Sequence, residues 1–249
     1  MFIPLHDANR LRHIRRQYVT FALIAVNVAV FAFTSLGTQQ ITEAAVWGLG
    51  YIPSTIYDFA HRPPEMVLVP DNATYITYAF LHGDIFHLGG NMLFLWVFGD
   101  NVEDALGHVR FLVFYVLSAA AGALLHGLLI PESQAPLIGA SGAIAGIVAA
   151  YLILHPSVKV WILAFGRLPL RIPAWVALAL WVGFQFFMLA IAGEDTVSWA
   201  AHVGGILAGA LLVLVMRRSG VPLFDREIIA PRAVEITPVP SPREAAPTG

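Results

Sequence analysis

The sequence predicts an all-α membrane protein whose six transmembrane helices form a single bundle, with the N-terminus and the C-terminus both cytoplasmic. Hydrophobic residues make up 58% of the 249 residues and charged residues only 12%, whereas soluble domains carry about 25% charged residues. Six segments are apolar over enough residues, or nearly enough, to cross a bilayer. Lys and Arg residues are concentrated on alternate connections between these segments, as the positive-inside rule describes.

Composition also excludes several classes of function. The net charge of −2 gives no basic excess, so a nucleic-acid partner is not expected. The chain has no cysteine, which excludes disulfides, thiolate catalysis and cysteine-bound zinc. The apolar run near the N-terminus continues to Leu36 and is longer than the hydrophobic region of a signal peptide. It is therefore interpreted as the first transmembrane helix.

The helix boundaries follow from the need of a spanning helix to satisfy its own backbone, which takes about 20 mostly apolar residues. The second and fourth segments are short by this measure and carry glycine or polar residues near their first turns. We therefore expect these two inside the bundle, beside a water-filled cavity. The six helices are predicted within one domain, 18–216, at residues 18–36, 85–98, 111–130, 141–154, 173–192 and 199–216.

The orientation of the bundle follows from the basic residues. Of the 14 Lys and Arg residues, all except Arg62 fall on the inner side if the N-terminus is inside. This asymmetry predicts a basic cytoplasmic N-terminus over residues 1–17, and it predicts outer helix ends for Ser141 and His202. Residues 217–249 are rich in proline and lack apolar periodicity, so we expect a disordered cytoplasmic tail there.

A serine opens the fourth predicted helix, in the segment Gly139-Ala140-Ser141-Gly142. The start of a helix offers free backbone N–H groups and the positive end of the helix dipole, which suit a developing oxyanion. Serine is also a favoured N-cap residue. This motif by itself therefore fits a capping role as well as a catalytic one.

A histidine lies in the sixth predicted helix, in Ala201-His202-Val203-Gly204-Gly205, near the same outer face as the serine. Small residues let helices approach closely in lipid, so glycine stripes on the fourth and sixth helices are expected to bring His202 toward Ser141. A neutral imidazole there can take the serine proton. The alternative is ordinary membrane packing around a hydrogen-bonded structural histidine. The glycines expected at this contact are Gly142, Gly146, Gly205 and Gly209.

Two further polar residues, His87 and Asn91, lie one turn apart at the start of the second predicted helix. Both can donate hydrogen bonds into one cavity, which is the chemistry of an oxyanion hole. Each alone also fits a polar residue that bonds across helices. For His82, just before this helix, a structural role in the loop is expected.

Taken together, the serine motif, the histidine motif and the H-x-x-x-N pair resemble the rhomboid intramembrane proteases over about residues 75–216. The segment 99–107 resembles the cytosolic turn of that family after its second helix. The resemblance implies a minimal six-helix bacterial-type member in the inner (plasma) membrane. Ser141 would be the nucleophile and His202 the general base of a dyad without an acid, and the Ser141 backbone N–H would join His87 and Asn91 in the oxyanion hole.

The resemblance further implies that the substrates are single-pass transmembrane proteins, cleaved in or near their membrane segments within the lipid bilayer. No metal and no cofactor are expected. Many relatives carry an aromatic residue four positions after the serine, where this chain has Ala145, so the way His202 is held is open. Many also carry a Trp-Arg pair in the first loop, which is missing around residues 72–75. Glu194 and Asp195 are assigned to a loop and not to a triad.

Competing functions are tested against motifs. The His-Glu-x-x-His motif of zinc proteases and the Gly-x-Gly-Asp motif of aspartyl intramembrane proteases do not occur. A catalytically inactive rhomboid-like factor for membrane-protein quality control is the stronger alternative, but such proteins usually lack the serine or the histidine. A transporter or channel would explain polar residues within the membrane without a nucleophile.

Overall fold

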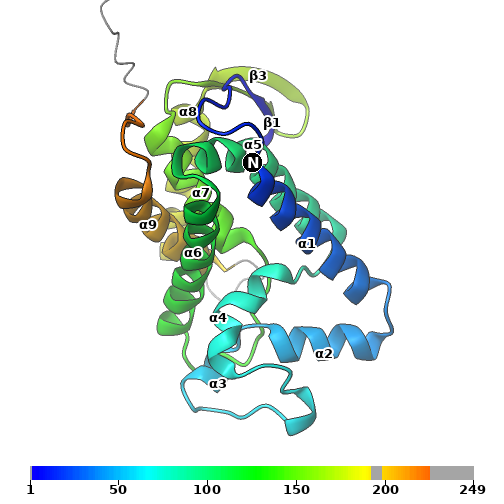
Figure 1. The fold of residues 1–249 in the computed structure, drawn as a ribbon. Coiled ribbons are helices and arrows are strands. Elements are labelled where there is room, and N and C mark those ends of the chain that lie inside the picture. Colours follow the sequence, from blue (N-terminus) through cyan, green and yellow to red (C-terminus); the bar gives the residue numbers. More distant parts are fainter. Residues whose placement is uncertain (1, 192–197, 225–249) are drawn as a thin grey trace, which may run out of the picture.

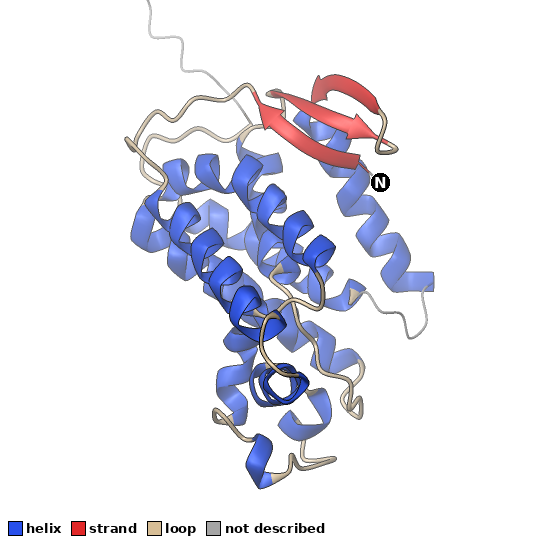
Figure 2. Ribbon diagram, turned by 90° about the vertical axis from the view of Figure 1, so that its right-hand side faces the viewer, coloured by secondary structure: helices blue, strands red, loops and turns tan. Residues whose placement is uncertain are grey.

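The computed structural model describes residues 2–191 and 198–224, and in this part of the chain long helices pack as a bundle with a small sheet at one end (Figures 1 and 2). The long helices are α1 (Tyr18–Ser35), α5 (Ile85–Leu106), α6 (His108–Leu129), α7 (Ser141–Leu154), α8 (Ala174–Ile191) and α9 (Trp199–Met216). Shorter helices α2 (Gln39–Leu49), α3 (Pro53–Ile56) and α4 (Thr74–Thr77) lie between α1 and α5. The strands are β1 (Phe2–Asp7), β2 (Lys159–Ala164) and β3 (Leu168–Pro173).

The outer surface of the bundle is apolar. Among the described residues, α1, α6, α8 and α9 are long and apolar enough to cross a membrane. Large hydrophobic side chains project from them, with Leu180 71% exposed and Phe187 57% exposed on α8. Such a surface is suited to lipid, because a soluble protein rarely exposes a continuous apolar face.

The short helix α7 forms the centre of the bundle. It has 14 residues, and every residue from Gly142 to Tyr151 is buried. Helices α5, α6, α8 and α9 surround it. The size of the side chains on α7 is therefore limited by the neighbouring helices and not by lipid.

The second predicted helix is longer in the structure than its sequence suggests. It was expected to end at residue 98, with a turn over 99–107, but α5 continues to Leu106 and only Gly107 breaks the chain, at φ 87°. The helix α5 continues through the acidic residues of its last turns, because their carboxylates accept hydrogen bonds from backbone N–H groups near the N-terminus. Glu103 accepts the backbone N–H groups of Val19 and Thr20, and Asp104 accepts those of residues 12–14.

The sheet was not part of the all-α prediction, which is corrected here. Its strands are antiparallel in the order β1-β2-β3, and β2 buries Val160 and Ile162 against the bundle. The turn between β2 and β3 is tight, with positive φ at both Phe165 and Gly166. The N-terminal residues of the basic segment 1–17 thus form an edge strand beside a connection that lies more than 150 residues later.

Part of the expected tail also packs against the bundle. Val221 is buried, the backbone N–H of Arg218 donates to the carbonyl oxygen of Ala105, and that of Phe224 donates to Ile153. The expectation of disorder for the rest of 217–249 lies outside the described residues. So do Glu194 and Asp195.

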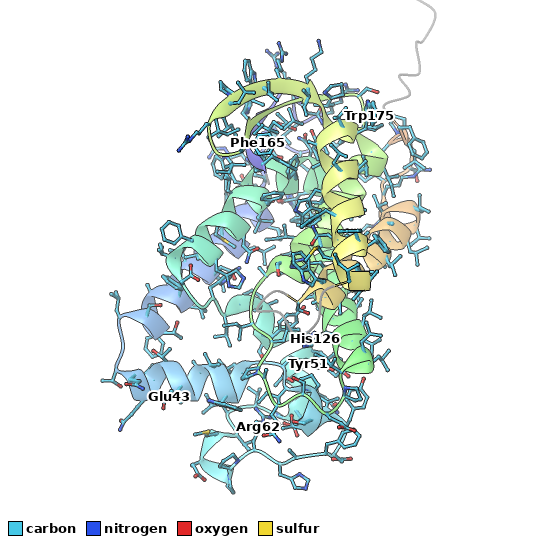
Figure 3. The ribbon with its side chains drawn as sticks, turned by 180° about the vertical axis from the view of Figure 1, so that it is seen from behind. Glu43, Tyr51, Arg62, His126, Phe165 and Trp175 are labelled. Atoms are coloured by element: carbon cyan, nitrogen blue, oxygen red, sulfur yellow. The ribbon has the colours of Figure 1, made fainter. Side chains whose placement is uncertain are left out.

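The two ends of the bundle differ in character. The sheet, the end of α5 and the start of α6 lie at one end, while α2 and α3 lie at the other (Figure 1). Figure 3 shows Phe165 and Trp175 at the sheet end, and Tyr51 and His126 together near the opposite end. Ser141 begins α7, and Ser198 caps the start of α9 just before His202.

Candidate active site

The turn that leads into α7 is shaped by a glycine. Gly139 has φ 122°, a conformation that residues with a side chain rarely adopt. A Cβ at this position would also lie 2.6 Å from Nε2 of His87 and 3.8 Å from Nδ2 of Asn91. Both polar side chains of α5 therefore face the turn that ends at Ser141, the first residue of α7.

The backbones of α7 and α9 touch at their glycines. A Cβ on Gly205 would lie 1.9 Å from the carbonyl oxygen of Gly142, and one on Gly209 would lie 2.3 Å from that of Gly146. In lipid, such small residues allow helix backbones to meet without intervening side chains. Ser141 precedes Gly142 and His202 lies one turn before Gly205, so this contact sets the two helix ends bearing them side by side.

The His202 ring is held by side chains of α8 and by its own helix. Its Nδ1 atom lies 2.8 Å from Oε1 of Gln185. The ring centroid lies 6.2 Å from that of Trp181, with the planes tilted by 31°, and 6.0 Å from that of Trp199, which meets it edge to face. Position 145 has no aromatic side chain to hold His202, and Gln185 and Trp181 of the neighbouring helix α8 hold the ring instead.

Ala145 makes room for this arrangement. It is fully buried in a small cluster with Ala149 and Ile206, against which Trp181 packs. An aromatic side chain at position 145 would compete with Trp181 for the same region, because protein interiors have little spare volume. The aromatic contact to the histidine therefore comes from α8 in this chain.

Asp84 fixes the start of α5. Its carboxylate accepts the backbone N–H groups of Phe86 at 2.8 Å and His87 at 2.9 Å, which is an N-cap interaction. Asn91, one turn after His87, is buried, and its Nδ2 atom has no partner among the described residues. A buried amide donor without a partner costs about 1–3 kcal/mol, so a polar ligand there would be stabilised.

A second serine–histidine pair lies in the structure. Oγ of Ser198 is 2.7 Å from Nδ1 of His126 on α6. The same hydroxyl accepts the backbone N–H of Ala201 at 3.2 Å and caps α9. This pair orients the first turn of the helix that carries His202, a structural task for which serine is well suited.

Sequence reasoning missed Gln185. Its sequence context could have indicated it, because Gln185 is the one amide in the apolar segment 174–191. An isolated polar residue in a membrane helix faces the bundle interior and is a functional candidate by default.

The fold and this site define an integral, multi-pass membrane protein with polar groups gathered inside a helical bundle. Residues 71–219 match the Rhomboid domain family. The chain is 32% identical over 202 residues to Rhomboid protein 1, mitochondrial, of Saccharomyces cerevisiae, covering 78% of this chain and 51% of that protein. It is 26% identical over 202 residues to the human presenilin-associated rhomboid-like protein, mitochondrial, covering 78% of this chain and 47% of the relative. The chain therefore belongs to the rhomboid family.

A third relative is RHOMBOID-like protein 6, mitochondrial, of Arabidopsis thaliana, 30% identical over 141 residues, which are 57% of this chain and 42% of the relative. The chain thus spans about half the length of the curated relatives it matches. These three relatives are eukaryotic and mitochondrial by name, so they do not support the bacterial type that the sequence suggested.

Proposed function

We propose that this protein is an intramembrane serine endopeptidase that hydrolyses peptide bonds in or near the transmembrane segments of other membrane proteins. The observation that carries the proposal is the backbone contact between Gly142 and Gly205, which sets the helix ends bearing Ser141 and His202 side by side. The polar donors of α5 face the turn beside Ser141. Under this proposal, the nucleophile, the base and the hydrogen-bond donors come from separate helices and surround one point, the arrangement that acyl transfer requires.

In the proposed reaction, Ser141 Oγ attacks the carbonyl carbon of the scissile peptide while His202 takes the hydroxyl proton. The negative oxygen that forms is stabilised by His87, Asn91 and the backbone N–H of Ser141. His202 then gives its proton to the leaving amine, and the C–N bond breaks to leave an acyl-enzyme. Water, deprotonated by His202, hydrolyses this ester and restores the serine.

The proposed substrates are single-pass transmembrane proteins, because the site lies within a bundle whose outer surface suits lipid. We further propose that α1 and α5 to α9 all cross the bilayer, with both termini cytoplasmic. The distribution of Lys and Arg supports this orientation. We propose the bacterial inner (plasma) membrane as the location of this bundle.

The alternative is a rhomboid-like factor that binds membrane proteins without cleaving them. The retained Ser141 and His202 favour the protease, since neither residue would be required for binding alone.

The proposal is tested with a fluorophosphonate probe, which reacts with activated serines. Wild-type protein in detergent is expected to be labelled, and Ser141→Ala and His202→Ala are expected to lose labelling while remaining folded. Labelling that persists in Ser141→Ala, or an unlabelled wild type that fails to cleave a model transmembrane substrate, would reject the protease. Substrate flux in proteoliposomes without cleavage would favour a transporter.

A further inference from the structure

Gln185 is an unusual residue for its position. Across α8, all of which the structure describes, it is the one amide, and the remaining residues are apolar or glycine. Phe184, Phe186 and Phe187 around it are exposed, as suits lipid, while Gln185 itself is 2% exposed. A polar side chain in an apolar environment is costly unless its hydrogen bonds are satisfied. Its burial toward α9 therefore indicates a specific partner.

Both ends of the Gln185 amide are bonded. Nε2 donates to the carbonyl oxygen of Trp181 at 3.0 Å, and Oε1 faces Nδ1 of His202 at 2.8 Å. A carbonyl oxygen can only accept, so the group that faces Trp181 must be the NH₂ group. Reversing the amide would set two oxygens against each other. The Oε1 atom is thereby fixed as the one that meets the histidine.

This orientation determines the protonation of the imidazole. Oε1 can only accept a hydrogen bond, so Nδ1 of His202 must carry a proton. In a neutral imidazole the other nitrogen, Nε2, then holds the lone pair. We infer that Gln185 is the positioning residue that holds His202 in the tautomer with its proton on Nδ1, so that Nε2 is the basic atom. This inference rests on the proposed function, because it assigns the atom of His202 that takes the serine proton.

A neutral acceptor differs from the carboxylate of a Ser-His-Asp triad. It selects the tautomer and the ring orientation, but it contributes no full negative charge to stabilise the imidazolium that forms in the reaction. It also avoids burying a carboxylate against the lipid-facing side of the bundle, which would be expensive. Gln185 thus supplies the orienting part of the role of a triad acid. Trp181 and Trp199 restrict ring rotation from two further sides.

The competing interpretation is that Gln185 makes an ordinary interhelical bond that merely ties α8 to α9. Such bonds contribute to stability and leave the turnover of the folded protein unchanged. In both interpretations the bond to Oε1 needs a proton on Nδ1 of His202. They differ in what the removal of Gln185 changes: the tautomer and kcat if Gln185 positions His202, and stability alone if it only ties the two helices together.

The first test uses ¹⁵N-histidine NMR of the Ser141→Ala protein in detergent, with His202 assigned by comparison with a Ser141→Ala, His202→Ala double variant. The expected spectrum shows a protonated Nδ1 and an unprotonated Nε2 at neutral pH. In Ser141→Ala, Gln185→Leu, both tautomers or a protonated Nε2 are expected. A protonated Nε2 in the presence of Gln185, or no change on its removal, would overturn the inference. This readout does not depend on catalytic activity.

The second test uses kinetics. Gln185→Leu is expected to lower kcat by about 10- to 100-fold, as the loss of an orienting partner does for a metal-ligating histidine, with little change in KM. Gln185→Glu in its protonated form can still donate to the carbonyl oxygen of Trp181 and offer an acceptor to Nδ1 of His202, so it should recover a large part of the loss. Phe187→Leu on the exposed face of α8 is the matched control and should keep normal turnover.

The outcomes of the two tests are distinguishable from failure of the proposed function. An active, labelled wild type together with normal kcat in Gln185→Leu would reject the role of Gln185 alone. A wild type that neither reacts with the probe nor cleaves substrate would reject the protease, whatever the NMR spectrum shows. Lower stability of Gln185→Leu with unchanged kcat in the folded fraction would assign Gln185 to interhelical packing and overturn the inference.

Discussion

A Cβ at position 205 would lie 1.9 Å from the carbonyl oxygen of Gly142. Gly205→Ala must therefore push α9 away from α7, because the opposing atom is backbone and cannot rotate aside. Overpacking of this kind costs about 1–3 kcal/mol or more. We expect a lower thermal midpoint in detergent and a large loss of fluorophosphonate labelling.

The matched control for this substitution is Gly183→Ala. A Cβ at Gly183 on α8 meets no atom within 4 Å, so the change should be neutral or slightly stabilising, since alanine favours helix by about 1 kcal/mol over glycine. Equal behaviour of the two variants would show that the contact between α7 and α9 does not position the dyad.

The donors of α5 give a second prediction. His87→Ala and Asn91→Ala should each lower kcat by about 10² to 10³, with little change in substrate affinity, because the charge they are proposed to bind exists only in the transition state. As interhelical packing bonds, they would instead contribute about 0.6–2 kcal/mol to stability and leave turnover normal. Measuring kcat and thermal stability on the same purified variants separates the two, and near-normal kcat in both would refute the oxyanion role.

The pH dependence of stability gives a third prediction. Burial, together with the nearby His87, lowers the pKa of His82 from 6.5 to about 4. Because the pKa is lower in the folded state, the unfolded chain binds more protons between these two values. The contribution of neutral, buried His82 to stability is complete above about pH 6.5 and is lost as the pH falls toward 4.

We therefore expect the thermal midpoint of the wild type to decrease between neutral pH and about pH 5. His82→Phe should decrease by less over the same range, because it has no group to protonate. The exposed His61→Asn serves as the control and should follow the wild type. An identical decrease in all three proteins would show that His82 is not the source.

The orientation of the bundle gives a fourth prediction, for which the lack of native cysteine is useful. Glu132→Cys, in the connection between α6 and α7, and Lys159→Cys, at the start of β2, both replace exposed residues. With a cytoplasmic N-terminus, a membrane-impermeant maleimide added to intact cells should label the first and not the second. Labelling of Lys159→Cys alone would invert the proposed topology.

The sequence by itself determined the positions of the long helices, because twenty apolar residues in a row have few alternatives to a helix in lipid. The predicted helices at 18–36, 141–154 and 199–216 end within one residue of α1, α7 and α9. The same reasoning placed the end of the second helix eight residues too early. In the sequence, the acidic residues near the end of α5 are typical of a turn. Their hydrogen-bond partners lie in residues 12–20, far away along the chain.

Only the tertiary structure decided the contacts between distant segments. The pairing of β1 with β2 joins residues more than 150 positions apart, and the strands are too short to be recognised from local periodicity. The sequence analysis did not single out Gln185 in its apolar segment, and it left open how His202 is held. The rotation of α8 about its axis brings Oε1 of Gln185 to 2.8 Å from Nδ1 of His202. Hydropathy predicts which segments are helices. The rotation of each helix about its own axis, and the helices that it contacts, depend on how all the helices pack together, and no single segment encodes that packing.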